Sequence, residues 1–320
     1  MSEEGGIRAT IAALAANLAI ALTKFLAWLL TGASSMLSEA IHSLADTGNQ
    51  VLLLVGGRQG SRGPSEAHPF GHGRQRYVNA FLVSVILFSV GGLFALYEAL
   101  HKAAEVLSGG GDELMASRWW WVPLAVLLVS AVAESLSLRT ALAETREQRR
   151  GKGIIGFVRA TKSPELPAVL LEDTAALAGL ALALIGIVLT LVTGNGIYDC
   201  IGSGLIGVLL IAVAVLLGHE MQSLLLGESA DPETQARIVT ALTSTPGVES
   251  VIHMKTVHTG PEQILVAAKI AVTRTESAEY IAAVIDVAER NVRWNEPRCE
   301  YIYLEPDIRR SSYRPARRKF

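Results

Sequence analysis

Residues 36–57 read MLSEAIHSLADTGNQVLLLVGG, an apolar stretch that carries three ionisable side chains, Glu39, His42 and Asp46. A helix of about 20 residues spans a bilayer, so the stretch is long enough to cross one. Each ionisable side chain in hydrocarbon costs about 2.5 to 3.5 kcal/mol on insertion scales, and those that persist usually face a protein interior or an aqueous path. Because the three are spaced i, i+3 and i+7, they lie on one face of a helix. The stretch therefore predicts a membrane-spanning helix whose polar face points into a site.

Five more stretches have the length and apolar character of membrane spans. They are Ile7–Leu30, Val78–Leu100, Trp119–Leu142, Leu166–Thr193 and Tyr198–Leu217. Of the 320 residues, 50% are hydrophobic and 18% are charged, which is too apolar for an ordinary soluble enzyme of this size. We therefore predict an integral, multi-pass α-helical protein that crosses the lipid bilayer with six transmembrane helices. Small residues in the last two stretches, including Gly186, Gly202 and Gly207, predict close helix packing.

Lysine and arginine gather in two of the connections between these stretches. Between the second and third they are Arg58, Arg62, Arg74 and Arg76, and between the fourth and fifth they are Arg146, Arg149, Arg150, Lys152, Arg159 and Lys162. The connections at 31–35, 108–116 and 193–197 contain neither residue type. Because basic loops stay in the cytoplasm, both termini are predicted to be cytoplasmic. The compact loops favour a bacterial inner membrane over an organelle.

The composition becomes that of a soluble domain from Glu228 onward. Helical periodicity and strand-like runs follow one another in the order αββαβ, at Asp231–Leu242, Val251–Val257, Ile264–Val272, Ala278–Val292 and Tyr301–Leu304. We place the transmembrane domain at 1–222, a cytoplasmic α+β domain at 223–307 and a basic, disordered tail at 308–320. The tail is expected to lie near anionic lipid headgroups rather than to bind nucleic acid.

Acidic residues also occur in two other membrane stretches. Glu172 and Asp173 are consecutive, hence about 100° apart on a helix, so one can bind metal while the other lies at a helix interface or in a proton path. Glu134 fits either a proton relay or a carboxyl held by hydrogen bonds between helices. The imidazole of His42 and the carboxylate of Asp46 supply half of a tetrahedral site suited to Zn²⁺, whereas Ca²⁺ and Mg²⁺ prefer oxygen ligands alone. The acids of the fifth stretch favour other metals over zinc. His42 and Asp46 could instead form a packing pair, but ionisable residues on two helices favour an ion site.

The segment Ser34–Asp46, followed by His68-Pro69-Phe70-Gly71-His72-Gly73-Arg74, resembles the cation diffusion facilitator family of divalent metal/proton antiporters. Leu226–Ala230 and Thr245–Val248 are similar to the junction and domain signatures of that family. The resemblance covers nearly the whole chain. Leu171-Glu172-Asp173 is similar to the fifth helix of a zinc-transporter-like subgroup that includes a mitochondrial branch.

The resemblance implies a homodimer that works by alternating access, with a tetrahedral metal site on the second and fifth helices. Its ligand positions are matched here by His42, Asp46 and Asp173. The first ligand of the fifth helix falls on Val169, and a valine cannot bind metal. Glu172, a water or Glu39 would have to take its place, which leaves the coordination and the identity of the metal open.

Two further regions carry ligand-type residues that the resemblance bears on. His68 and His72 match a second metal position in the cytoplasmic loop, although an exposed turn explains them equally well. The C-terminal domain is expected to have a metallochaperone-like fold, in which the regulatory positions hold non-ligands such as Ala268 and Tyr303. The ligand-type residues that remain there are His253, His258 and Glu305. We expect that domain to serve dimerisation rather than to bind a pair of regulatory metal ions.

The predicted function is secondary active transport that exports a divalent transition metal, with zinc as the first candidate, in exchange for protons. The groups that bind the metal also bind protons, so the two compete. We expect no resident cofactor and no enzymatic activity: a Walker loop and a His-Glu-x-x-His motif are absent from the sequence. Cys200 and Cys299 lie too far apart in sequence to suggest a thiolate zinc site. The alternatives are a non-transporting scaffold of the same fold, or transport of Mn²⁺, Co²⁺, Ni²⁺ or Fe²⁺.

Overall fold

The computed structural model describes residues 3–109, 113–149, 151, 153–273 and 276–309. Arg150 and Lys152 of the predicted basic connection, and residues 310–320 of the predicted tail, lie outside the described residues. The chain forms two compact units. The first consists of the described parts of Met1–Arg58 and Arg76–Gln222, and the second of those of Gln59–Gln75 and Ser223–Phe320.

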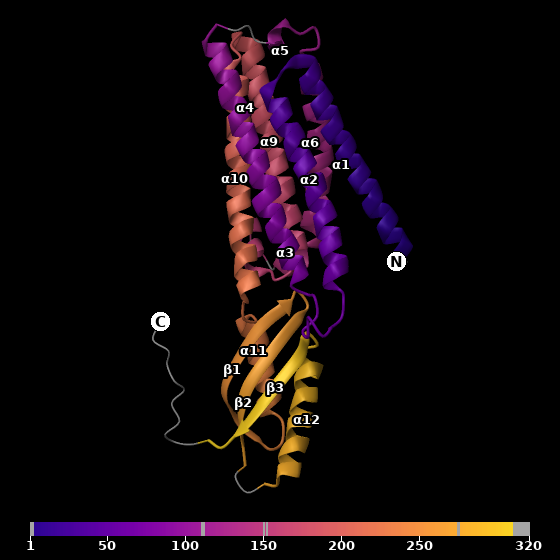
Figure 1. Ribbon diagram of the computed structural model, residues 1–320, viewed down its shortest axis with the longest axis vertical. Coiled ribbons are helices and arrows are strands. Elements are labelled where there is room, and N and C mark those ends of the chain that lie inside the picture. Colours follow the sequence, from indigo (N-terminus) through magenta and orange to yellow (C-terminus); the bar gives the residue numbers. More distant parts are fainter. Residues whose placement is uncertain (1–2, 110–112, 150, 152, 274–275, 310–320) are drawn as a thin grey trace. The chain divides into compact units, whose positions relative to one another are not determined.

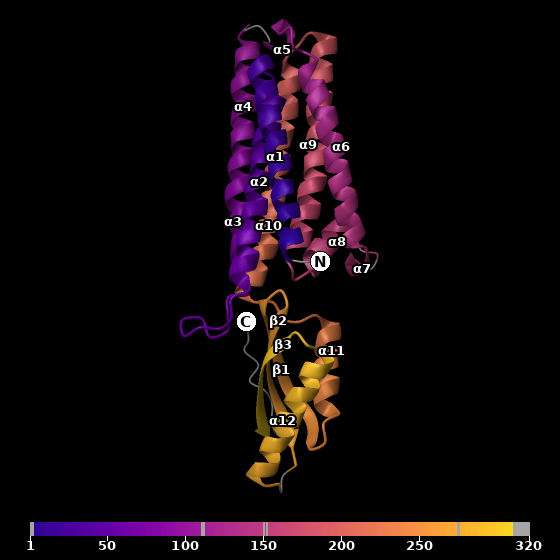
Figure 2. The same cartoon turned by 90° about the vertical axis from the view of Figure 1, so that its right-hand side faces the viewer.

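Long helices that run side by side make up the first unit (Figure 1 and Figure 2). They are α1 (Glu3–Thr31), α2 (Ser34–Gly60), α4 (Ser89–Leu107), α6 (Val122–Glu144), α9 (Glu165–Thr193) and α10 (Ile197–Leu226). The shorter helices are α3 (Gln75–Leu82), α5 (Glu113–Ala116), α7 (Arg146–Arg149) and α8 (Ile154–Ala160). All six predicted membrane stretches are thus helical where the structure describes them, except that Trp119–Trp121 form a turn before α6.

Four of the described helices are long and apolar enough to cross a membrane, namely Gln75–Leu107, Val122–Glu144, Pro167–Thr193 and Ile197–Leu226. The described part of α1 adds a shorter apolar segment, Asn17–Thr31. Helix α2 is less apolar because its buried face is polar, while Leu44, Val51 and Leu54 on it are exposed. A helix that buries its polar side chains and exposes its apolar ones is suited to lipid outside and a polar site inside.

The third predicted stretch, Val78–Leu100, is not one regular helix. A π-helical segment, η1 (Val83–Phe88), separates α3 from α4. Within it, the Ser84 hydroxyl donates to the carbonyl of Phe81 at 2.8 Å. Such a side-chain bond gives a backbone carbonyl a partner other than the regular helical amide, which is compatible with a wider turn. The apolar run predicts a helix by its length and composition, and a π-helical segment of six residues is too short to show a period of its own.

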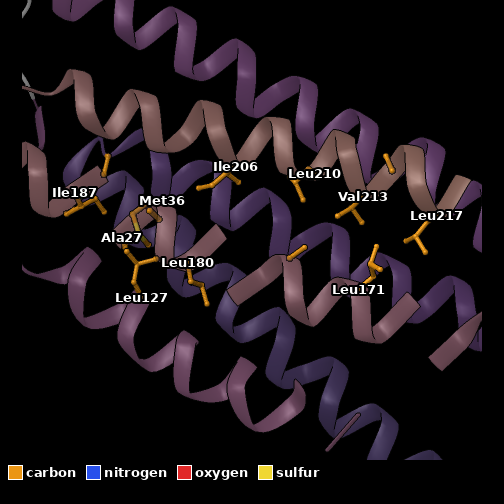
Figure 3. Packing of buried hydrophobic residues seen from close by; sticks show 14 of the residues in the cluster. Ala27, Met36, Leu127, Leu171, Leu180, Ile187, Ile206, Leu210, Val213 and Leu217 are labelled. Carbon is orange, nitrogen blue, oxygen red and sulfur yellow. The ribbon is translucent and has the colours of Figure 1, made fainter. Parts of the chain in front are cut away.

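The core of the first unit lies between its helices and is built from aliphatic side chains. Figure 3 labels Ala27, Met36, Leu127, Leu171, Leu180, Ile187, Ile206, Leu210, Val213 and Leu217 among the buried residues. Glycines bring backbones together: a Cβ at Gly92 on α4 would lie 2.8 Å from the carbonyl oxygen of Gly207 on α10. A Cβ at Gly186 on α9 would lie 2.9 Å from the carbonyl oxygen of Tyr198. The predicted role of these small residues in close helix packing is confirmed.

The second unit has the predicted element order αββαβ. Its elements are α11 (Pro232–Thr243), β1 (Val248–Gly260), β2 (Gln263–Val272), α12 (Ala278–Asn295) and β3 (Cys299–Asp307). The sheet order is β1-β2-β3, with β1 antiparallel and β3 parallel to β2. Side chains of both helices and of the sheet form one core, including Ile238, Leu242, Val266, Ile270 and Val292. The predicted α+β domain is confirmed as a compact layer of helices on a sheet.

The segment between α2 and α3 also belongs to the second unit. Phe70 meets the Tyr301 ring edge-on, with ring centroids 5.2 Å apart. At Gly73 a Cβ would lie 2.9 Å from the Cα of Gly260 at the end of β1, so only glycine fits this approach without displacement. A loop that connects two helices of the first unit in sequence therefore packs with the sheet of the second unit.

Candidate metal-transport site

A small cavity of about 60 Å³ lies among four helices of the first unit. Its lining is largely polar and comes from α1, α2, α6 and α9: Asn17, Ile20, Ser43, Asp46, Gln50, Ala133, Glu134, Ser137, Glu172 and Asp173. Four carboxyl groups from three separate helices, Asp46 on α2, Glu134 on α6 and the neighbouring Glu172 and Asp173 on α9, thus face one space inside the bundle. This is the arrangement that the cost of burying charge in a membrane predicts.

On α2, the regular helix places His42 and Asp46 one turn apart. Their Nδ1 and Oδ1 atoms are 3.5 Å from each other, and both side chains are buried. Of the two, Asp46 lines the cavity. The predicted pairing on one helix face is therefore present, and it leaves the two side chains close enough to bind one ion together.

On α9, the two consecutive acids interact with different helices. Glu172 accepts a hydrogen bond from the Asn49 side chain on α2, and Asp173 accepts one at 2.9 Å from the Ser137 hydroxyl on α6. Both carboxyls are buried and both line the cavity. Their divergence follows from the angle of about 100° between neighbouring helical positions. Asn49, which has no exposed surface, is a site residue that the sequence analysis did not identify.

Glu134 also lines the cavity, from α6, where its side chain is half-buried. Val169 on α9 packs instead against an apolar cluster that contains Ala141, Phe157 and Leu170. The position that departs from the family ligand pattern is thus used for packing. Over the described residues, no group of three or more His, Cys, Asp and Glu side chains lies close enough to hold a metal ion.

Glu39 lies in a different environment from His42 and Asp46. Its Oε2 is 2.8 Å from Nζ of Lys24 on α1, and neither side chain has any exposed surface. Lys24 is the second residue that the sequence analysis did not identify. The sequence did indicate it, because Lys24 lies within the apolar stretch Ile7–Leu30. A charged side chain in hydrocarbon is costly, so Lys24, like Glu39, is expected to have a partner inside the protein.

His68 and His72 lie in the second unit, in the segment between α2 and α3. Their rings are edge-on with centroids 4.5 Å apart. The Nδ1 atoms lie 2.7 Å from the Ala67 carbonyl oxygen and 3.3 Å from that of Gly63. This geometry keeps the two histidines together in an exposed turn, so both expectations for them, the turn and the second metal position, are compatible with it.

In the second unit, His253, Ala268, Tyr303 and Glu305 lie along one groove of the sheet. The groove is lined by His253, Lys255, Ala267, Ala268, Lys269, Tyr303, Leu304 and Glu305. Glu305 pairs with Lys269 at 2.7 Å, and the hydrogen bonds that this lysine donates to Glu305 and Asp307 raise its pKa. His258 is buried in β1, away from this groove lining. Because the Glu305 carboxylate is paired with Lys269, this groove is better suited to a structural role than to binding a metal ion.

Comparison with known proteins identifies the class of protein. Residues 10–226 match the cation efflux transmembrane domain family. The chain is 35% identical over 249 residues to the mitochondrial proton-coupled zinc antiporter SLC30A9 of Xenopus laevis. The aligned region covers 77% of this chain and 43% of the relative. The chain therefore belongs to the cation diffusion facilitator family, with similarity to its zinc-transporting members.

More distant relatives share the same region. Metal tolerance protein C4 of Arabidopsis thaliana is 29% identical over 274 residues, 84% of this chain and 58% of the relative. The cation-efflux pump FieF of Klebsiella pneumoniae is 26% identical over 262 residues, 81% and 78% of the two chains. A solved structure of the MamM C-terminal domain is 26% identical, covers 24% of this chain and 96% of that chain, and has a TM-score of 0.23. The chain spans less than half the length of the SLC30A9 relatives that it matches.

Proposed function

We propose that this cation efflux protein is a secondary active transporter that moves a divalent transition metal, zinc in the first place, out of the cytoplasm in exchange for protons. The observation that carries the proposal is the cavity in the helix bundle, where carboxyls from α2, α6 and α9 face one space. The zinc antiporters among the relatives support the choice of zinc.

The proposed ligands are His42, Asp46 and Asp173, with Glu172 as the fourth. One imidazole nitrogen and three carboxylate oxygens match the ligand types and number of a tetrahedral zinc site. Val169 cannot contribute, and Glu172 is the acid nearest to it in sequence that also lines the cavity. Closure of α2 towards α9 would complete the coordination, because these two helices supply all four groups.

Proton coupling follows from the chemistry of the same ligands. An imidazole or carboxyl that carries a proton cannot bind a metal ion at the same lone pair, so metal and protons exclude one another. In the proposed cycle, metal enters from the cytoplasm, and protons displace it when the site opens to the other side. Glu134, which lines the cavity without belonging to the proposed ligand set, would pass protons to the ligands.

The remaining proposals concern the assembly. We propose a homodimer in which the second unit supplies the dimer contact, in a bacterial inner membrane with both termini in the cytoplasm. The basic residues between α2 and α3 and between α6 and α9 support that orientation. The protein would need no cofactor, because the metal is cargo.

The test is metal flux into proteoliposomes across an imposed pH gradient, with Zn²⁺, Mn²⁺, Co²⁺, Ni²⁺ and Fe²⁺ compared. We expect flux of one metal to dissipate the gradient and to be lost in Asp46→Asn and in Asp173→Asn, which keep the size of the side chain and remove its charge. Glu144→Gln, at the exposed end of α6, is the matched control and should keep wild-type flux.

A second candidate is a non-transporting scaffold of the same fold, favoured by the apolar packing of Val169 at a family ligand position. It predicts no flux of any of the five metals by protein that is shown to be folded. It also predicts that Asp46→Asn leaves cellular metal levels unchanged. Flux that needs both Asp46 and Asp173 would exclude it.

A further inference from the structure

A buried ion pair joins α1 and α2 next to the cavity. The ammonium of Lys24 lies 2.8 Å from Glu39 Oε2 and also donates a hydrogen bond to the Ser43 hydroxyl at 2.7 Å. Both charged side chains are fully buried. A buried charge without a partner is costly, so each of the two charges depends on the other.

The pair continues the two helix faces that line the cavity. Ile20 lines the cavity from α1, and Lys24 follows it by four residues. On α2, Glu39 precedes Ser43 by four residues, and Ser43 itself lines the cavity. Residues four apart lie on the same side of a helix. The ammonium is therefore linked to the cavity lining through its hydrogen bond to the Ser43 hydroxyl.

Helix α9 limits the movement of the Glu39 carboxyl. A Cβ at Gly179 would lie 2.5 Å from Glu39 Oε1, so the glycine provides the space that this oxygen occupies. Oε1 itself has no hydrogen-bond partner among the described residues. Turning Glu39 towards the cavity would require breaking its contact with Lys24.

We propose that Lys24 is a positioning residue of the cation pathway: its fixed ammonium neutralises Glu39 and so sets the charge that the cavity offers to a divalent cation. The inference rests on the proposed transport function. With the pair intact, the carboxyls available to the cargo are those of Asp46, Glu172 and Asp173 rather than that of Glu39. Loss of the ammonium alone would add a negative charge beside them, and loss of the Glu39 charge alone would leave a positive one.

The effects of the two charges on metal affinity should have opposite signs. Charges act strongly on one another inside a protein, where the effective dielectric constant is well below that of water. At one fixed pH, we expect Lys24→Met to bind Zn²⁺ about tenfold more tightly and Glu39→Gln about tenfold more weakly than the wild type. The double variant, which replaces the ion pair by a neutral pair, should bind within about threefold of the wild type.

The measurement is calorimetric titration of the purified full chain in lipid nanodiscs with Zn²⁺, repeated with Co²⁺. Lys102→Met is the matched control, because it removes the lysine of an ion pair on α4 whose Lys102 Nζ and Glu105 Oε2 atoms are 3.2 Å apart. It should leave the affinity unchanged.

The outcomes separate the possibilities. Opposite shifts that cancel in the double variant support the inference. If both single variants weaken binding and the double variant is no better, the pair only maintains the fold and the inference is overturned. Unchanged affinity in all three variants of a wild type that binds metal also overturns it and leaves the proposed function standing. A wild type that binds neither ion contradicts the proposed function itself.

Discussion

At the scale of single residues, the cost of burying charge in a membrane explains which residues of the site could be predicted from the sequence and which could not. Asp46, Glu172 and Asp173 were predicted to gather at one site, and they line one cavity. Lys24 is likewise a charged residue in an apolar stretch, but it was not predicted to belong to the site because a lysine is not a metal ligand. Asn49 gives no such signal because an amide carries no charge, although its side chain contacts Glu172. Only the packing of α2 against α9 makes that amide part of the site.

The hydrogen bond from Asn49 to Glu172 should contribute to the stability of the bundle. Hydrogen bonds between helices in membranes contribute about 1 to 2 kcal/mol in model systems. Asn49→Ala is therefore expected to lower the free energy of unfolding by about 1 to 2 kcal/mol, because it leaves the buried Glu172 carboxyl without this donor. The measurement is unfolding in mixed micelles as the fraction of denaturing detergent rises.

The control for this variant is Asn295→Ala. The Asn295 amide is exposed and donates to the carbonyl of Asn291, one turn earlier in its own helix. It should change stability by less than about 0.5 kcal/mol. Equal effects of the two variants would show that the contact of Asn49 with Glu172 does not contribute more to the free energy of unfolding than an exposed hydrogen bond does.

At the scale of elements, the middle of α11, the end of α12 and the start of β3 meet at one charged cluster. Glu296, which ends α12, accepts hydrogen bonds from Arg237 on α11 and from Arg298 just before β3, both at 2.6 Å. Burial alone would raise the pKa of Glu296, but the hydrogen bonds from Arg298 and Arg237 outweigh it and hold the pKa below its usual value. The order αββαβ was readable from periodicity, whereas this junction was not, because it joins residues 59 positions apart.

Glu296→Gln should destabilise the second unit by about 1 to 2 kcal/mol at pH 7, since Arg237 is partly solvated and the pair is screened. A carboxyl whose pKa is lower in the folded state stabilises the fold above its unfolded pKa, and that contribution is lost as the pH falls through the folded pKa. The difference between variant and wild type should therefore shrink below about pH 4. Thermal unfolding across this range measures it, and a difference that grew towards low pH would contradict the assignment.

At the scale of the whole molecule, the chain forms two compact units, and two separate segments of the sequence contribute to the second one. Residues 59–75 leave the helix bundle after α2, pack with the sheet domain and return at α3. Each unit has one cysteine, Cys200 in α10 and Cys299 at the start of β3, and both are buried and not joined in a disulfide. The reactivity of each thiol can therefore report the unfolding of the unit that contains it.

Neither thiol should react with a maleimide dye while the protein is folded. The reacting species is the thiolate, and burial raises the pKa of the Cys299 thiol to about 12, so at pH 8 it is almost fully protonated in the native state. On unfolding, its pKa returns to about 8.5 and labelling becomes fast. We expect Cys200→Ser to report the unfolding of the second unit and Cys299→Ser that of the first, each followed by dye fluorescence during heating. Rapid labelling of native protein at either position would contradict the burial described above.

The sequence by itself determined the membrane helices, the order of elements in the C-terminal domain and the acids of the candidate site. Hydrophobic length, periodicity and the cost of buried charge are local properties that a chain displays before it folds. Tertiary structure alone decided that Glu39 pairs with Lys24, that Asn49 contacts Glu172 and that the segment after α2 packs on the sheet domain. These depend on which helix faces and which strands meet, and a buried charge specifies only that it needs a partner, not which one.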